Sequence, residues 1–131
     1  MLLIGLFAGA MGVVMVLRAI EARKTWEDRF PQAAMQVMNA HVAQLKSAAA
    51  ANRCAASEVL PHVQSLRVLA NDLEPAFPGL REDARFAEHA RNMRATLDQV
   101  IASPPVACPA AEAALVEINQ ACRACHQDFR G

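Results

Sequence analysis

The chain has 131 residues, a length that suits one domain with an N-terminal extension. Hydrophobic residues make up 54% of it, aromatic residues only 5%, and tyrosine is absent, which favours closely packed helices over a β-sandwich or barrel. Basic and acidic residues number 13 each, and from residue 31 onward there are 9 basic and 10 acidic residues. A surface that binds nucleic acid needs a basic stripe, so this balance argues against nucleic acid as a partner.

An uncharged apolar segment opens the chain. Residues 1–17 carry no charged side chain and would span about 25 Å as a helix, close to the roughly 30 Å of a membrane's hydrocarbon core. Because Ala19 and Ile20 can extend this helix, we predict that residues 1–20 are a transmembrane anchor. A cleaved signal sequence is the alternative, but its best cleavage site, after Ala22, has Ile20 where a small residue is preferred.

Residues 21–30 are expected to form a charged connector between this anchor and a domain that covers residues 31–131. The basic residues around this connector argue against a domain on the periplasmic side of the membrane. Arg18, Arg23 and Lys24 follow the apolar run, and the positive-inside rule would place them in the cytoplasm. The motif near the C-terminus, described below, outweighs that conflict.

Four segments with apolar residues at helical spacing follow, separated by breaks that contain proline or glycine. They are expected at residues 31–51, 57–73, 81–101 and 109–131. The third segment repeats apolar residues on one face, at Phe86, Ala90, Met93, Leu97 and Val100. Pro31 and Pro109 suit the first turn of a helix, whereas Pro61 leaves the start of the second helix open between Ser57 and Pro61. Residues 74–79 contain two prolines and a glycine and are expected to be a turn.

Four helices with short connections predict an all-α fold, an antiparallel up-down-up-down four-helix bundle behind an N-terminal apolar helix. In that topology the end of the fourth helix lies beside the start of the first, which carries Met35 and Met38. At the opposite pole the starts of the second and fourth helices meet, near Cys54 and Cys108. We therefore predict a disulfide between these two cysteines, with two buried free thiols as the alternative.

The most specific pattern in the chain lies near its C-terminus. Cys122-Arg123-Ala124-Cys125-His126 is the C-x-x-C-H signature of covalent c-type haem attachment. Each thiol can bond one vinyl group of the same porphyrin, and the adjacent imidazole can ligate the iron. A zinc site would need further closely spaced ligands, and a redox C-x-x-C normally opens a helix in a βαβ pattern. We predict one haem c per chain, attached through Cys122 and Cys125 and ligated by His126.

Both thiols are expected to face the helical core. Five residues of the last helix alternate at intervals of three and four, namely Leu115, Ile118, Cys122, Cys125 and Phe129. This spacing predicts a single core-facing stripe, so the haem would lie between helices. The remaining histidines, His41, His62 and His89, have no partner motif and are expected to be surface or hydrogen-bonded residues rather than ligands.

The sequence Cys122–Arg130, at the end of an alanine-rich helix, resembles the cytochrome c′ and cytochrome c-556 family of class II c-type cytochromes. Residues 34–41 and 73–79 resemble that family's first helix and the turn after its second, so the likeness extends from Pro31 to Arg130. The resemblance implies a four-helix bundle with a basic residue, here Arg130, four positions after the haem histidine. The chain departs from the family at Pro31, where a basic residue is common, and in its short connection between the second and third helices.

The resemblance implies two alternatives for the sixth coordination position of the iron. In the c-556-like branch a methionine of the first helix ligates the iron and the protein carries electrons, whereas in cytochromes c′ the position is open and binds NO or CO. Alignment of the first helix places Met35 at this position, so we expect Met35 as the ligand ahead of Met38, one turn further along. A thioether ligand raises the reduction potential and suits electron transfer, although methionines at helical spacing often only fill a core.

These patterns predict a membrane-anchored monohaem cytochrome on the periplasmic side of a bacterial inner membrane, where such haem motifs are loaded. It would carry single electrons to a redox partner protein or a membrane electron-transfer complex. It would not be an enzyme, since nothing besides the haem offers an acid, base or nucleophile. The alternatives are a soluble periplasmic form after cleavage, an NO- or CO-binding protein, and a haem-bearing accessory subunit of a membrane complex. The family commonly dimerises through its first two helices, which makes a homodimer a further expectation of the resemblance.

Overall fold

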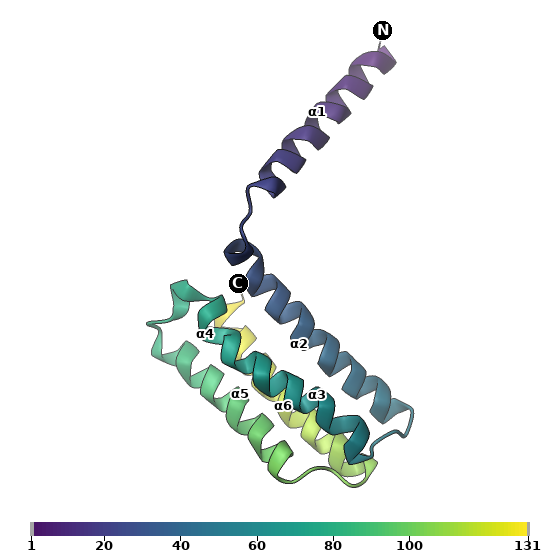
Figure 1. The fold of residues 1–131 in the computed structure, drawn as a ribbon, viewed down its shortest axis with the longest axis vertical. Coiled ribbons are helices and arrows are strands. Elements are labelled where there is room, and N and C mark those ends of the chain that lie inside the picture. The colour runs from purple at the N-terminus through teal and green to yellow at the C-terminus, as the bar shows by residue number, and fades with distance from the viewer. Residues whose placement is uncertain (1, 131) are drawn as a thin grey trace. The chain divides into compact units, whose positions relative to one another are not determined.

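A computed structural model describes residues 2–130, with side chains from Gly5 onward. All regular secondary structure in this part of the chain is helical, which confirms the all-α class (Figure 1). The elements in chain order are α1 (Leu2–Ala22), α2 (Trp26–Ala50), α3 (Ala56–Leu69), the 3₁₀ turn η1 (Ala70–Asp72), α4 (Leu73–Ala76), the 3₁₀ turn η2 (Pro78–Leu80), α5 (Ala84–Ala102) and α6 (Cys108–Phe129).

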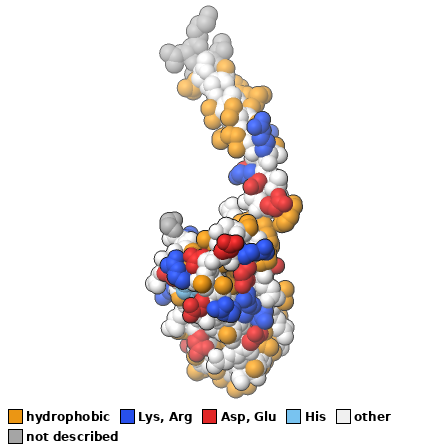
Figure 2. Space-filling view, turned by 90° about the vertical axis from the view of Figure 1, so that its left-hand side faces the viewer, with side chains coloured by type: hydrophobic (Ala, Val, Ile, Leu, Met, Phe, Trp, Pro, Cys, Tyr) orange, Lys and Arg blue, Asp and Glu red, His pale blue; other side chains and the backbone are white. Residues whose placement is uncertain are grey.

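The chain divides into two units, Met1–Phe30 and Pro31–Gly131. In the first unit, α1 is long and apolar enough between Gly5 and Ala22 to cross a membrane, a criterion of length and composition that signal sequences also meet. Apolar side chains of α1 are exposed along much of its length, among them Leu6 and Phe7 (Figure 2). The first unit therefore contains a helix suited to a membrane or to a signal sequence.

The prediction that the first helix of the domain begins at Pro31 is wrong, because α2 begins five residues earlier, at Trp26. The backbone N–H of Thr25 donates to Oδ2 of Asp28 over 2.8 Å. This bond satisfies the free N–H of the residue before the helix, as in a capping box. Glu27 and Asp28 also place negative charge in the first turn, where it interacts favourably with the helix dipole. These side chains fix the helix start before the proline.

Helix α3 starts ahead of both predicted positions, Ser57 and Pro61, and no side chain caps its start. Helix α3 begins at Ala56, so Pro61 is its sixth residue, as Pro31 is in α2. The backbone N–H groups of Glu58 and Val59 donate to the carbonyl of Ala55, and Val59 is buried. The burial of this first turn stabilises helical structure ahead of the proline despite the one lost hydrogen bond.

The turn predicted over residues 74–79 is also mostly helical. Glu74 to Ala76 belong to α4, and η2 begins at Pro78, so Phe77 is the residue between them. Arg94 of α5 holds this segment with two hydrogen bonds to the Glu74 carboxylate, at 2.9 and 3.0 Å, and a third to the Ala70 carbonyl. Arg94 therefore supplies a tertiary anchor that the local sequence does not reveal.

The core of the second unit is built from the apolar faces of its helices. All five residues of the periodic stripe on α5 are buried, as the sequence predicts. Helix α5 packs against both α3 and α6 (Figure 1). Asp83 caps α5, since its carboxylate accepts a hydrogen bond from the backbone N–H of Arg85, which is why this helix begins at Ala84 rather than at Arg81.

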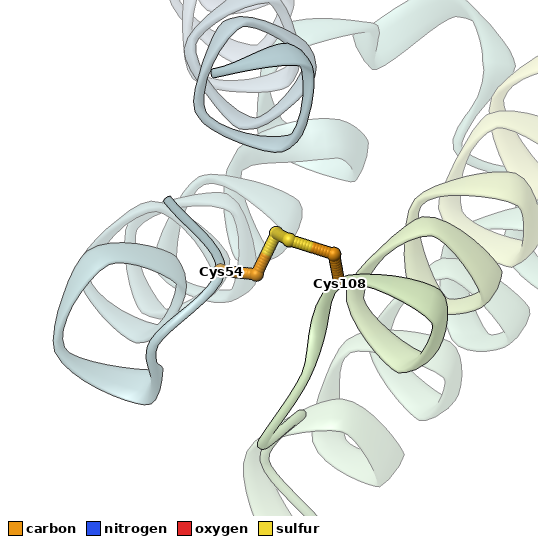
Figure 3. Close-up of a disulfide and its surroundings, with 2 residues drawn as sticks. All are labelled: Cys54 and Cys108. Carbon is orange, nitrogen blue, oxygen red and sulfur yellow. A yellow bond between two sulfur atoms is a disulfide. The ribbon is translucent and has the colours of Figure 1, made fainter. Parts of the chain in front are cut away.

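Cys54 and Cys108 lie at disulfide distance, with their Cα atoms 5.0 Å apart (Figure 3). Cys54 precedes α3 and Cys108 is the first residue of α6, so the bridge joins the starts of the two helices. It closes a loop over a sequence separation of 54 residues. In the chain-entropy model, a loop of this length stabilises the fold by about 4 kcal/mol.

Candidate haem-binding site

The second unit contains a cavity of about 670 Å³, within the roughly 300–1,000 Å³ typical of ligand and cofactor sites. Its walls come from α2, α3, α5 and α6 and from the segment between α3 and α5. All six cofactor-binding residues predicted from the sequence line it, namely Met35, Met38, Cys122, Cys125, His126 and Arg130. The fold thus brings residues from both ends of the domain sequence to one concave site.

Helix α6 positions the two thiols three residues apart in its C-terminal half. Both side chains are half-buried and pack against the core cluster. Burial raises the pKa of the Cys122 thiol, and burial, Cys122 and Asp128 together raise the pKa of the Cys125 thiol. Reactive redox cysteines usually lie at helix N-termini with a lowered pKa, so this arrangement is unlike a redox dithiol. It suits thiols that become uncharged thioethers in an apolar wall.

His126 lies in the last turn of α6, one residue after Cys125, and is exposed while lining the cavity. Arg123 and Arg130 are exposed residues of the same lining. The candidate iron ligand and two cations therefore border the cavity from the same helix end as the thiols.

The two methionines differ in their environment. Met38 is 7% exposed and belongs to the buried core cluster, whereas Met35 is half-buried and only packs against that cluster. Both lie on α2 and both line the cavity. Met35 therefore has the less constrained side chain of the pair.

His89 is hydrogen-bonded, which is one of the two states that the sequence predicts for it, but its partner could not be named from the sequence. His89 lines the cavity, and its Nε2 lies 2.9 Å from Oδ2 of Asp128, which is 39 residues away in sequence. Its ring also meets Phe129 edge-on at 5.9 Å. Local sequence carries no signal of this contact. Only the expected pairing of the third and fourth helices could have indicated it.

Three phenylalanines extend the same wall. Phe86 meets Phe77 edge-on at 5.7 Å and Phe129 edge-on at 5.3 Å, and all three line the cavity. Edge-to-face aromatic contacts of this kind add about 0.5–1.5 kcal/mol beyond the burial of their area. They join α5 to the last turn of α6 and give the cavity a firm apolar side.

His41 and His62 also have a partner that the sequence did not predict, since they contact each other between α2 and α3. No group of three or more His, Cys, Asp or Glu side chains in the described part of the chain is placed to hold a metal ion. A haem iron would need fewer side-chain ligands than a free metal ion, because the porphyrin supplies four of its ligands and the protein at most two.

The chain matches no protein-family model, no curated protein sequence and no solved structure.

Proposed function

We propose that residues 31–131 form an antiparallel four-helix bundle of the class II cytochrome type that binds one covalent haem c. Contacts of α5 support the helix directions. Arg94 contacts Glu74, whereas Asp98, one turn later in α5, contacts the earlier residue Arg67. Residues further along α5 thus contact residues that come earlier in the preceding helical segments, as expected for antiparallel neighbours. Along α5 and α6, Phe86 and His89, both in the first two turns of α5, contact Phe129 in the last turn of α6, so the start of one helix lies beside the end of the other.

The disulfide supports the placement of the remaining pair. Since Cys54 precedes α3 and Cys108 opens α6, the bridge favours a common pole for the starts of these helices. The contact between His41 and His62 supports α2 and α3 as neighbours. These links agree with the up-down-up-down connection expected from the short loops.

The observation that carries the haem proposal is one cavity lined by both cysteines and the histidine of the C-x-x-C-H motif and by both candidate methionines. Cys122 and Cys125 would form the thioether links, His126 would ligate the iron, and Met35 would be the sixth ligand. Met35 is favoured over Met38 because its side chain is not locked in the core. A bound haem would supply a one-electron iron couple.

Other residues of the chain would support that role. The apolar wall of Phe77, Phe86 and Phe129 excludes water, which keeps charge changes at the iron in a low-dielectric environment. Arg123 and Arg130 offer cations to the haem carboxylates at the exposed border of the cavity. We infer single-electron transfer as the function, with a redox protein or a membrane electron-transfer complex as the partner.

We further propose that residues 1–20 anchor this domain on the periplasmic side of a bacterial inner membrane. The apolar α1 supports the anchor, and the disulfide supports an oxidising compartment. Retention of the protein in the membrane fraction after an alkaline wash would agree with the anchor. Release of a shorter soluble form would replace it with a cleaved signal sequence.

Visible spectroscopy with and without CO tests the proposed coordination. The wild type should show a low-spin spectrum with a sharp reduced α-band that CO does not change. Met35→Ala should become CO-sensitive, while the matched variant Met38→Ala keeps the wild-type response. A wild-type spectrum that is high-spin and shifts with CO would overturn methionine ligation and favour the gas-binding alternative.

A further inference from the structure

A histidine pair joins α2 to α3 outside the candidate haem-binding site. Nδ1 of His41 lies 3.1 Å from Nδ1 of His62, with the ring centroids 5.4 Å apart and the rings tilted by 51°. Both side chains are half-buried, and neither lines the large cavity. Electron transfer as proposed above makes no use of these two imidazoles.

We propose that His41 and His62 form a binding site for a divalent transition-metal ion, with Nδ1 of each ring as a ligand. Metal–imidazole bonds of about 2.0–2.1 Å at angles of about 90–110° place two ligand nitrogens about 2.9–3.4 Å apart. The observed separation of 3.1 Å lies within that range. The two helices therefore hold the nitrogens at a spacing that one ion can bridge.

The chemistry of the ligands selects the class of ion. Imidazole nitrogens suit zinc, copper and nickel, and for a given nitrogen site the affinity is highest for Cu²⁺. In the described residues no third His, Cys, Asp or Glu completes a cluster here, so water would fill the other positions around a bound ion. The site is then an open one that binds Cu²⁺ ahead of Ni²⁺ and Zn²⁺, rather than a closed structural zinc site.

The protonation state of the pair favours this role. Burial and the neighbouring His62 hold the pKa of His41 below its ordinary value. A metal ligand must be the neutral imidazole, so His41 needs to lose no proton to bind an ion near pH 7. The hydrogen bond between the two rings needs a proton on one Nδ1 and none on the other. Ion binding would shift that proton to Nε2 of its own ring, which leaves both imidazoles neutral with both Nδ1 atoms free to ligate.

Calorimetric titration with Cu²⁺ tests the site on the full-length, disulfide-bonded chain in detergent. The thiols Cys122 and Cys125 are first blocked, by haem attachment or, if no haem is bound, by alkylation. The test therefore stands whether or not the haem proposal holds. We expect one Cu²⁺ per chain in the wild type and loss of this binding in His41→Gln and in His62→Gln.

Gln64→Ala, an exposed position on the same helix as His62, is the matched control and should keep the copper site. Copper EPR gives a second readout, because nitrogen couplings from two imidazoles should appear in the wild type and be absent from each single variant, which no longer binds the ion. Circular dichroism of each variant checks that the helices remain folded. Wild-type protein that takes up no stoichiometric copper, or folded His62→Gln that retains the site, would overturn the proposal.

Discussion

Nε2 of His89 lies 2.9 Å from Oδ2 of Asp128, and this contact ties the start of α5 to the last turn of α6. Asp128 is two residues after His126, within the turn that ends the C-x-x-C-H motif. Phe129, the next residue, packs edge-on against both His89 and Phe86. The position of the haem motif is therefore set by α5 as well as by α6.

Removal of this contact should loosen the end of α6. Asp128→Ala is expected to lower the free energy of unfolding by about 1 kcal/mol or less, because the pair is partly exposed. Glu117→Ala removes an exposed carboxylate elsewhere on α6 and serves as the matched control. Urea unfolding compares the two variants. An equal loss in both would contradict a specific role for the His89 contact.

Loss of the disulfide should be costly. In the double variant Cys54→Ala/Cys108→Ala, the free energy of unfolding is expected to fall by up to about 4 kcal/mol, since the unfolded chain regains the entropy of a long loop. Urea unfolding of the wild type with and without reductant provides the comparison. Reductant should lower the wild-type midpoint and leave the double variant unchanged. A urea midpoint of the wild type that is the same with and without reductant would argue against the disulfide.

Leu97 on α5 is fully buried, and its truncation should leave a cavity in the core. We expect Leu97→Ala to lower the free energy of unfolding by about 2–5 kcal/mol. Val116→Ala on α6 is the control, because Val116 is 55% exposed and should cost no more than about 0.5 kcal/mol. Comparable losses in the two variants would show that α5 does not form the centre of the core.

Stability should fall as the pH drops from 7.5 to 5.5. The pKa of His41 is lowered in the folded state from its ordinary value of 6.5 by burial and by His62, so the unfolded chain binds protons first. The contribution of His41 to stability is then fully present above pH 6.5 and is lost as the pH falls toward its pKa in the folded state. Thermal unfolding at pH 7.5 and at pH 5.5 measures this loss of stability.

In His41→Gln this pH dependence should weaken. The pKa of Glu74 is also lowered, through its bonds to Arg94, but from 4.5, so that carboxylate contributes only in more acidic solution. A slope between pH 7.5 and 5.5 that is unchanged in His41→Gln would show that other groups cause it.

Features that depend on nearby residues could be predicted from the sequence. The apolar stripe of α5, for example, follows from helical periodicity, and the structure buries all five of its residues. The proximity of Cys54 to Cys108 needed one further step, the up-and-down order of the helices, and their Cα atoms lie 5.0 Å apart. Helical periodicity therefore predicted the buried face of α5, and the expected order of the helices predicted the cysteine pair.

Features that depend on competition between local and tertiary forces were missed. Pro31 and Pro61 suggested helix starts, but capping by Thr25 and Asp28 and the burial of Val59 extended both helices across the prolines. The segment after Leu73 looked like a turn because its contact to Arg94 is 20 residues away. Histidine partners separated by 21 and 39 residues leave no trace in the spacing of either residue.

We propose that the haem is attached covalently, and the intact mass of the chain tests this attachment. We would produce the full chain in a bacterium that has the haem-attachment machinery and record the denatured mass. We expect the mass of the chain plus one haem in the wild type and in folded Cys54→Ala/Cys108→Ala. The added haem mass should be lost in Cys122→Ala/Cys125→Ala. A wild-type chain that is folded, carries the disulfide and shows no added haem mass would contradict it.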